Sequence, residues 1–135
     1  MTKVVLDTNI LVSAVLGGRL TGILEAWNAG KFTLLVSDAI ITEYITVLNR
    51  PKFGLPVQVV ENIVGSLVRK AVFVIPDTDI EIIIDDPDDN KFLAAALAGN
   101  AEFIVSGDQH LLTISSYQQI EIINAREFMQ RIEGK

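Results

Sequence analysis

With 135 residues, the chain has an ordinary length for one domain, and we expect a single domain over residues 1–135. Half of its residues are hydrophobic, but the apolar runs fall short of the roughly 18 residues that cross a bilayer, and the first residues do not resemble a secretion signal. The absence of cysteine excludes a disulfide framework and a thiolate metal site, and these features together fit the cytoplasm.

The net charge of −6 is concentrated in one segment. Residues 79–90 contain six acids and no Lys or Arg, which leaves 11 acids and 11 bases in the rest of the chain. An acidic protein is at first sight a poor partner for nucleic acid, because basic patches supply most of that affinity. A local block of carboxylates is either a solvated loop or a cation site.

The first predicted element is a buried strand over residues 4–6, followed by Asp7, Thr8 and Asn9. The residues after such a strand lie at the carboxyl edge of the sheet, where open α/β sheets bind ligands. Asp7 has a simpler explanation as the cap of the helix that follows, because a carboxylate accepts hydrogen bonds from free N–H groups at a helix start.

Helices and strands then alternate along the chain. Apolar residues at helical spacing predict helices from residue 9 to the Gly17-Gly18 pair and over 21–29, 38–49, 56–70, 91–98 and 125–132, with a helical turn at 111–112. Short apolar runs predict further strands over 32–36, 71–75, 103–105 and 120–123, and an extended segment over 80–84. This order predicts the α/β class, as a single-domain α/β/α sandwich with a mostly parallel central sheet of about five strands.

Two further acids lie at helices of this pattern. Glu43 sits at the border of the apolar stripe of helix 38–49, in the turns nearest the carboxyl end of the preceding strand. Asp89 is expected in the first turn of the next helix, with Asp86 as the cap and Pro87 at the first helical position. Each acid could equally be an ordinary surface or helix-start residue.

Asp108 is the fourth candidate acid, because it follows the predicted strand 103–105. All parallel strands end at one edge of their sheet, so Asp7, Glu43, Asp89 and Asp108 can converge although 36 to 101 residues separate the others from Asp7.

Four carboxylates in a small volume would repel one another and raise each other's pKa values, and a divalent cation relieves this. Oxygen ligands favour Mg²⁺ or Mn²⁺ over zinc, and two such ions could activate water in phosphodiester cleavage. Thr8, Asn9 and Ser106 are candidates to orient the carboxylates.

With these residues in view, the chain resembles PIN-domain ribonucleases of the VapC-like toxin type. The matching motifs span nearly the whole chain and are Asp-Thr-Asn at 7–9, the helical Glu43, Asn-Arg-Pro-Lys-Phe at 49–53, Asp-Pro-Asp-Asp-Asn-Lys at 86–91 and Val-Ser-Gly-Asp at 105–108. The resemblance implies a PIN-like fold and an endoribonuclease that uses one or two Mg²⁺ or Mn²⁺ ions. It also implies a homodimer, an antitoxin partner encoded beside the toxin, and metal binding by Asp7, Glu43, Asp89 and Asp108.

One position departs from the family pattern, because related sequences often have an acid where this chain has His110. His110 is either a weaker or substitute ligand or a loop residue with no metal role. Arg19, Arg50, Lys52 and Lys91 are candidate RNA contacts, since they could line the mouth of the site and neutralise phosphates, although scattered bases are also common on surfaces.

Three other functions compete with this hypothesis. A haloacid-dehalogenase-like phosphatase needs a second Asp two residues after the first, where this chain has Asn9. A response-regulator receiver domain needs a Lys late in the chain, and none lies between Lys91 and Lys135. A catalytically inactive PIN-fold binding module would use the acids only as helix caps, and titration with Mg²⁺ or Mn²⁺ separates it from the enzyme.

Overall fold

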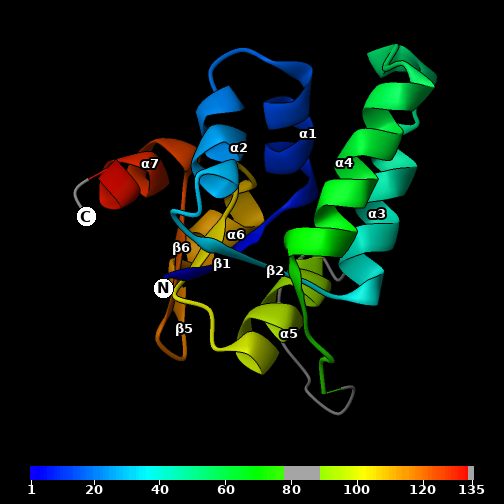
Figure 1. Cartoon of the computed structure of the whole chain (residues 1–135). Coiled ribbons are helices and arrows are strands. Elements are labelled where there is room, and N and C mark those ends of the chain that lie inside the picture. The colour runs from blue at the N-terminus through cyan, green and yellow to red at the C-terminus, as the bar shows by residue number, and fades with distance from the viewer. Residues whose placement is uncertain (78–88, 134–135) are drawn as a thin grey trace.

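The computed structural model describes residues 1–77 and 89–133 (Figure 1). The strands are β1 (Lys3–Leu6), β2 (Thr33–Val36), β3 (Val72–Phe73), β4 (Phe103–Val105), β5 (Ser116–Tyr117) and β6 (Ile120–Ile123). The helices are α1 (Thr8–Leu16), α2 (Thr21–Asn28), α3 (Asp38–Leu48), α4 (Val57–Lys70), α5 (Asn90–Gly99), α6 (Gln109–Ile114) and α7 (Ala125–Glu133), with a short 3₁₀ helix η1 (Pro51–Phe53).

The described strands form one central sheet in the order β3-β2-β1-β4-β6-β5. Neighbouring strands are parallel except β5 and β6, which are antiparallel. Helix α5 packs against β1, β2 and β4, while α1 and α2 lie on the other side of the sheet (Figure 1). The predicted α/β sandwich with a mostly parallel sheet is therefore confirmed.

The strands expected over 4–6, 32–36, 71–75, 103–105 and 120–123 each overlap an observed strand, but the sheet has six strands within the described ranges rather than about five. The additional strand is β5, which turns back into β6 through Gln118 and Gln119 at φ values of 45° and 74°. Hairpin turns with positive φ values usually contain Gly, Asn or Asp. Two glutamines occupy the turn here, so the sequence pattern did not predict it. The expected extended segment 80–84 and the expected cap Asp86 lie outside the described residues.

The strand order reverses between β1 and β4, because β2 and β3 lie beyond β1 while β6 and β5 lie beyond β4. The apolar side chains of both central strands are buried, as expected for strands covered on both faces. The two strands end together, and the backbone N–H of Asp7 donates to the carbonyl of Val105 at 3.0 Å. In sheets of this kind the ligand site lies outside the carboxyl ends of the strands at such a reversal.

Helix α3 is held against the end of β1 by Tyr44. The ring of Tyr44 is fully buried, and its hydroxyl donates to the carbonyl of Leu6, the last residue of β1. Glu43, the residue before Tyr44, is thereby fixed beside the point where the chain leaves β1.

In the described ranges, no single helix is long and apolar enough to cross a membrane. Helices α1 and α2 reach that length and composition only as a pair, and the pair is bent by 93°.

Replacing Tyr44 by Phe should lower the free energy of unfolding by about 1–2 kcal/mol, because the carbonyl of Leu6 loses its donor where water has no access. Urea unfolding of the purified chain measures this loss. The matched control is Tyr117→Phe, at a partly exposed tyrosine, which should change the free energy by less than about 0.5 kcal/mol. Equal losses for the two variants would contradict the role given to the Tyr44 hydroxyl.

Candidate functional site

Asp7 lies at the centre of the strand reversal and is only 5% exposed. Its Oδ1 accepts a hydrogen bond of 2.9 Å from the backbone N–H of Ile10, so Asp7 is the N-cap of α1. Its Oδ2 accepts a hydrogen bond from the hydroxyl of Ser106, the first residue after β4. The capping explanation of Asp7 is thus correct, and it does not exclude a place at the edge of the sheet.

The pKa of the Asp7 carboxyl is raised above its ordinary value of 3.8, mainly because burial disfavours the charged form. Hydrogen bonds from Ser106 and the backbone N–H of Ile10 oppose this rise, and the negative charge of Asp108 adds to it. Asp7 therefore lies where a positive charge would be favourable.

Glu43 is half-buried on α3, with two donors around its carboxylate. The hydroxyl of Thr8 donates to Oε2, and the ammonium group of Lys91 forms an ion pair with Oε1. The side chains of Lys91 and Glu43 are only 22% and 30% exposed, so the pair is partly shielded from water. Lys91 was expected to contact RNA, and nothing in the sequence indicated this pairing, which joins residues 48 positions apart.

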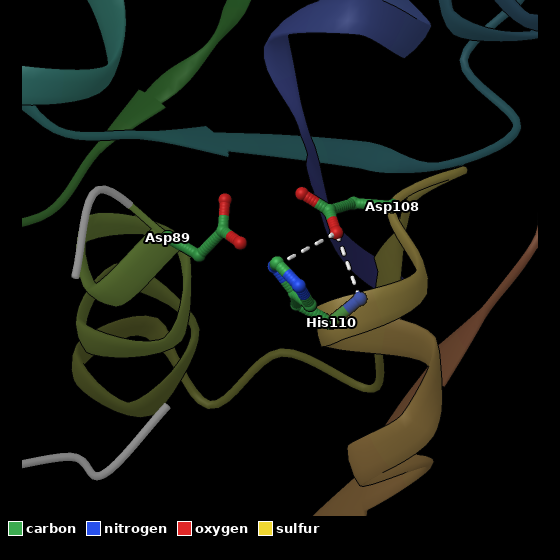
Figure 2. Close-up of side chains that lie close together, drawn as sticks. All are labelled: Asp89, Asp108 and His110. Carbon is green, nitrogen blue, oxygen red and sulfur yellow. Dashed lines mark hydrogen bonds and ion pairs between the residues drawn. The ribbon is translucent and has the colours of Figure 1, made fainter. Parts of the chain in front are cut away.

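Asp89, Asp108 and His110 form a second part of the site (Figure 2). One potential ligand atom from each residue lies within 4.8 Å of the others. Asp89 is 8% exposed and directly precedes α5, while Asp108 caps α6 by accepting a 2.8 Å hydrogen bond from the backbone N–H of His110. Among the described residues, these three are the group of His, Cys, Asp or Glu side chains that lie close enough together to hold a metal ion.

One pocket of about 210 Å³ connects the two parts of the site. Its lining contains all four predicted acids. The lining residues are Asp7, Thr8, Asn9, Glu43, Val47, Arg50, Asp89, Phe92 and Asp108. A larger hollow of about 530 Å³ lies between α5 and the β5–β6 turn, but Glu102 is the single charged residue among its lining, so the acid-lined pocket is the better candidate for chemistry.

The other predicted site residues are placed as follows. Ser106 and Thr8 donate to Asp7 and Glu43, and Asn9 lines the pocket with an exposed side chain. Of the predicted RNA contacts, Arg50 lines the same pocket. Lys52 is exposed on η1, and Arg19 is exposed in the connection between α1 and α2, outside the pocket lining.

The chemistry of these donors fits a divalent cation. The pocket offers carboxylate oxygens from four separate segments, with one imidazole at its edge and no thiol. The charge of Asp108 raises the pKa of Asp7, which means that the carboxylates repel one another and that a cation would stabilise their charged forms. Carboxylate oxygens are ligands that Mg²⁺ and Mn²⁺ accept.

A family model described as PIN domain matches residues 3–110 of the chain. The matched segment begins with β1 and ends at His110, so it includes every residue of the acid-lined pocket and the group of Asp89, Asp108 and His110. The β5–β6 hairpin and α7 lie beyond it. No curated protein matches the chain significantly.

The raised pKa of Asp7 predicts a pH dependence of stability when metal ions are removed. The folded state keeps the Asp7 proton to higher pH than the unfolded chain, so Asp7 lowers the free energy of unfolding as pH rises from 3.8 through the raised value. Asp7→Asn removes this ionisation. The free energy of unfolding of the variant minus that of the parent should therefore increase over this pH range and become constant above it.

Urea unfolding in EDTA, at a series of pH values from about 3.5 upward, measures this difference. A difference that does not change with pH would contradict the conclusion that burial disfavours the charged form of Asp7.

Proposed function

Because this chain belongs to the PIN domain family, whose members are generally metal-dependent nucleases, we propose that it is an endoribonuclease that hydrolyses RNA phosphodiester bonds. The observation that supports this proposal most is the lining of one pocket by Asp7, Glu43, Asp89 and Asp108, which come from four separate segments. An arrangement of helix caps without a ligand would not require four acids to share one pocket.

In this proposal the four acids hold one or two Mg²⁺ or Mn²⁺ ions. The bound metal would supply an activated water and charge stabilisation for the leaving oxygen. Two neighbouring hydroxyl groups orient the ligands: Ser106 donates to Asp7, and Thr8 donates to Glu43.

RNA would reach the acids past Arg50, which lines the pocket, and Lys52, which is exposed two residues further on. Arg19 and Lys91 are proposed as further contacts, although Lys91 would have to leave or share its ion pair with Glu43. With a net charge of −6, the protein should hold RNA weakly when no metal is bound, because affinity for phosphates comes largely from basic groups that displace the counterions of the nucleic acid.

We further propose that the chain is the toxin of a type II toxin–antitoxin pair, as a homodimer that acts on cytoplasmic RNA and is held inactive by an antitoxin protein. The motifs at residues 7–9, 49–53, 86–91 and 105–108 support this, because they match the VapC-like toxins. Large apolar side chains that a protein partner could cover also remain exposed. Among them are Val57, Val68, Val72, Phe73 and Ile75.

Cleavage of a mixed-sequence RNA with Mn²⁺ or Mg²⁺ tests the enzymatic proposal. Asp7→Asn should reduce the rate at least about 100-fold, because one ligand loses its charge while the hydrogen bond from Ile10 can be kept. EDTA should abolish the activity of the parent. The matched control is Glu61→Gln, an exposed carboxylate on α4 outside the pocket, which should leave the rate unchanged. Equal cleavage by the parent and Asp7→Asn would refute the site assignment.

The toxin proposal has its own test. Induced expression in a bacterial host should arrest growth, because cleavage of cellular RNA stops protein synthesis, and expression of Asp7→Asn at the same level should not. Viable counts after induction and size-exclusion chromatography with light scattering measure toxicity and the dimer. An active ribonuclease that leaves growth unchanged would contradict the toxin role while leaving the enzymatic proposal intact.

A further inference from the structure

We infer that His110 supplies a ring nitrogen to the metal site and gives it a preference for Mn²⁺ over Mg²⁺. This inference rests on the proposed metal-dependent function, and it concerns one residue at which the chain departs from an all-carboxylate site. His110 lies outside the lining of the acid-lined pocket, beside Asp108 at its edge.

The start of α6 fixes the position of His110. Its backbone N–H donates to Oδ1 of Asp108 at 2.8 Å, and its ring Nδ1 lies 3.8 Å from the same oxygen. The two side chains are therefore held together by the cap of a helix. Figure 2 shows the imidazole ring between the carboxylates of Asp108 and Asp89, which lie at the starts of two different helices, α6 and α5.

The distances within this group suit a shared ion. Ligand atoms at about 2.1 Å from an octahedral ion are about 3 Å apart when adjacent and about 4.2 Å apart when opposite. The ligand atoms of Asp89, Asp108 and His110 lie within 4.8 Å of one another, so small side-chain rotations bring all three into range. The side chain of His110 is 54% exposed, which leaves it free to make such a rotation.

A nitrogen ligand changes the preference of the site. Mg²⁺ favours oxygen ligands and gives up its water reluctantly. An imidazole nitrogen is a softer ligand, which zinc, copper, iron and nickel bind most strongly, and Mn²⁺, as a first-row transition ion, accepts it more readily than Mg²⁺ does. An acid in place of His110 would add a negative charge and an oxygen, both of which favour Mg²⁺. An imidazole nitrogen that binds a metal ion brings neither a negative charge nor an oxygen, so the chain should select Mn²⁺ more strongly than a site of carboxylates alone.

The rest of the pocket does not offer an alternative nitrogen ligand in the described residues. The side-chain nitrogen of Lys91 forms an ion pair with Glu43, but an ammonium group has no lone pair with which to bind a metal ion. Arg50 lines the pocket with a guanidinium, which does not ligate metals for the same reason. An imidazole signal at the metal would therefore have one source.

Pulsed electron paramagnetic resonance of the full chain with Mn²⁺ tests the inference directly. His110 is the one histidine in the sequence, so a protein prepared without a histidine tag can give imidazole ¹⁴N coupling to Mn²⁺ through this residue alone. We expect this coupling in the parent and its loss in His110→Gln. The control Gln109→Ala changes the exposed neighbouring side chain and should keep the coupling.

Calorimetric titration of the same proteins measures the preference. His110→Gln should weaken Mn²⁺ binding about tenfold and Mg²⁺ binding less. His110→Asp should strengthen Mg²⁺ binding relative to the parent and lower the ratio of Mn²⁺ to Mg²⁺ affinity.

The outcomes separate the inference from the proposed function. Mn²⁺ binding without imidazole coupling, with unchanged affinities in His110→Gln, would overturn the role of His110 and leave the carboxylate site in place. Such a result would leave the imidazole of His110 as a neighbour of Asp108 without a metal contact. No binding of either ion by the parent would overturn both the inference and the metal-dependent function.

Discussion

The hydrogen bond from Ser106 to Asp7 joins the carboxyl ends of the two central strands, and the remaining site residues are arranged around this junction. β1 and β4 pair in parallel up to Leu6 and Val105, so the next residues of both strands emerge side by side. A carboxylate emerging there is buried by the surrounding helices, and its burial raises its pKa. The fold thus holds a carboxyl group where its charged form is unfavourable without a positive partner, which is a common property of functional sites.

Three of the acids are also helix N-caps or occupy that position. Asp7 and Asp108 accept backbone hydrogen bonds at the starts of α1 and α6, and Asp89 directly precedes α5. Capping and ligand binding use different lone pairs of the same carboxylate, so the two roles are compatible. Capping also fixes the side chain before any ion arrives, because a carboxylate already bonded to the backbone loses little freedom on coordination.

Much of the fold was predictable, because the alternation of short apolar runs with helical periodicity is local information. The β5–β6 hairpin was missed because Gln118 and Gln119 adopt positive φ values without the residues that usually announce them. For the site, strand polarity predicted which edge Asp7 and Asp108 would reach. The pairing of Lys91 with Glu43 could not be predicted in this way, since it depends on how α3 and α5 lie against each other, and no short-range pattern encodes that.

The charges of the site are balanced unevenly. Glu43 has the ammonium group of Lys91 beside it, and Thr8 donates to it as well. Within residues 1–77 and 89–133, the donors to Asp7 are the neutral groups of Ser106, Ile10 and Gly107, and the charge that acts on its pKa is the negative one of Asp108. Beside Asp108 lies the imidazole of His110, whose nitrogen can bind a proton or a metal ion but not both. A cation is therefore needed most beside Asp7 and Asp108, which lack the ammonium partner that Glu43 has in Lys91. In the proposed site, His110 lies next to Asp108, so the residue at this position would influence which ion is bound there.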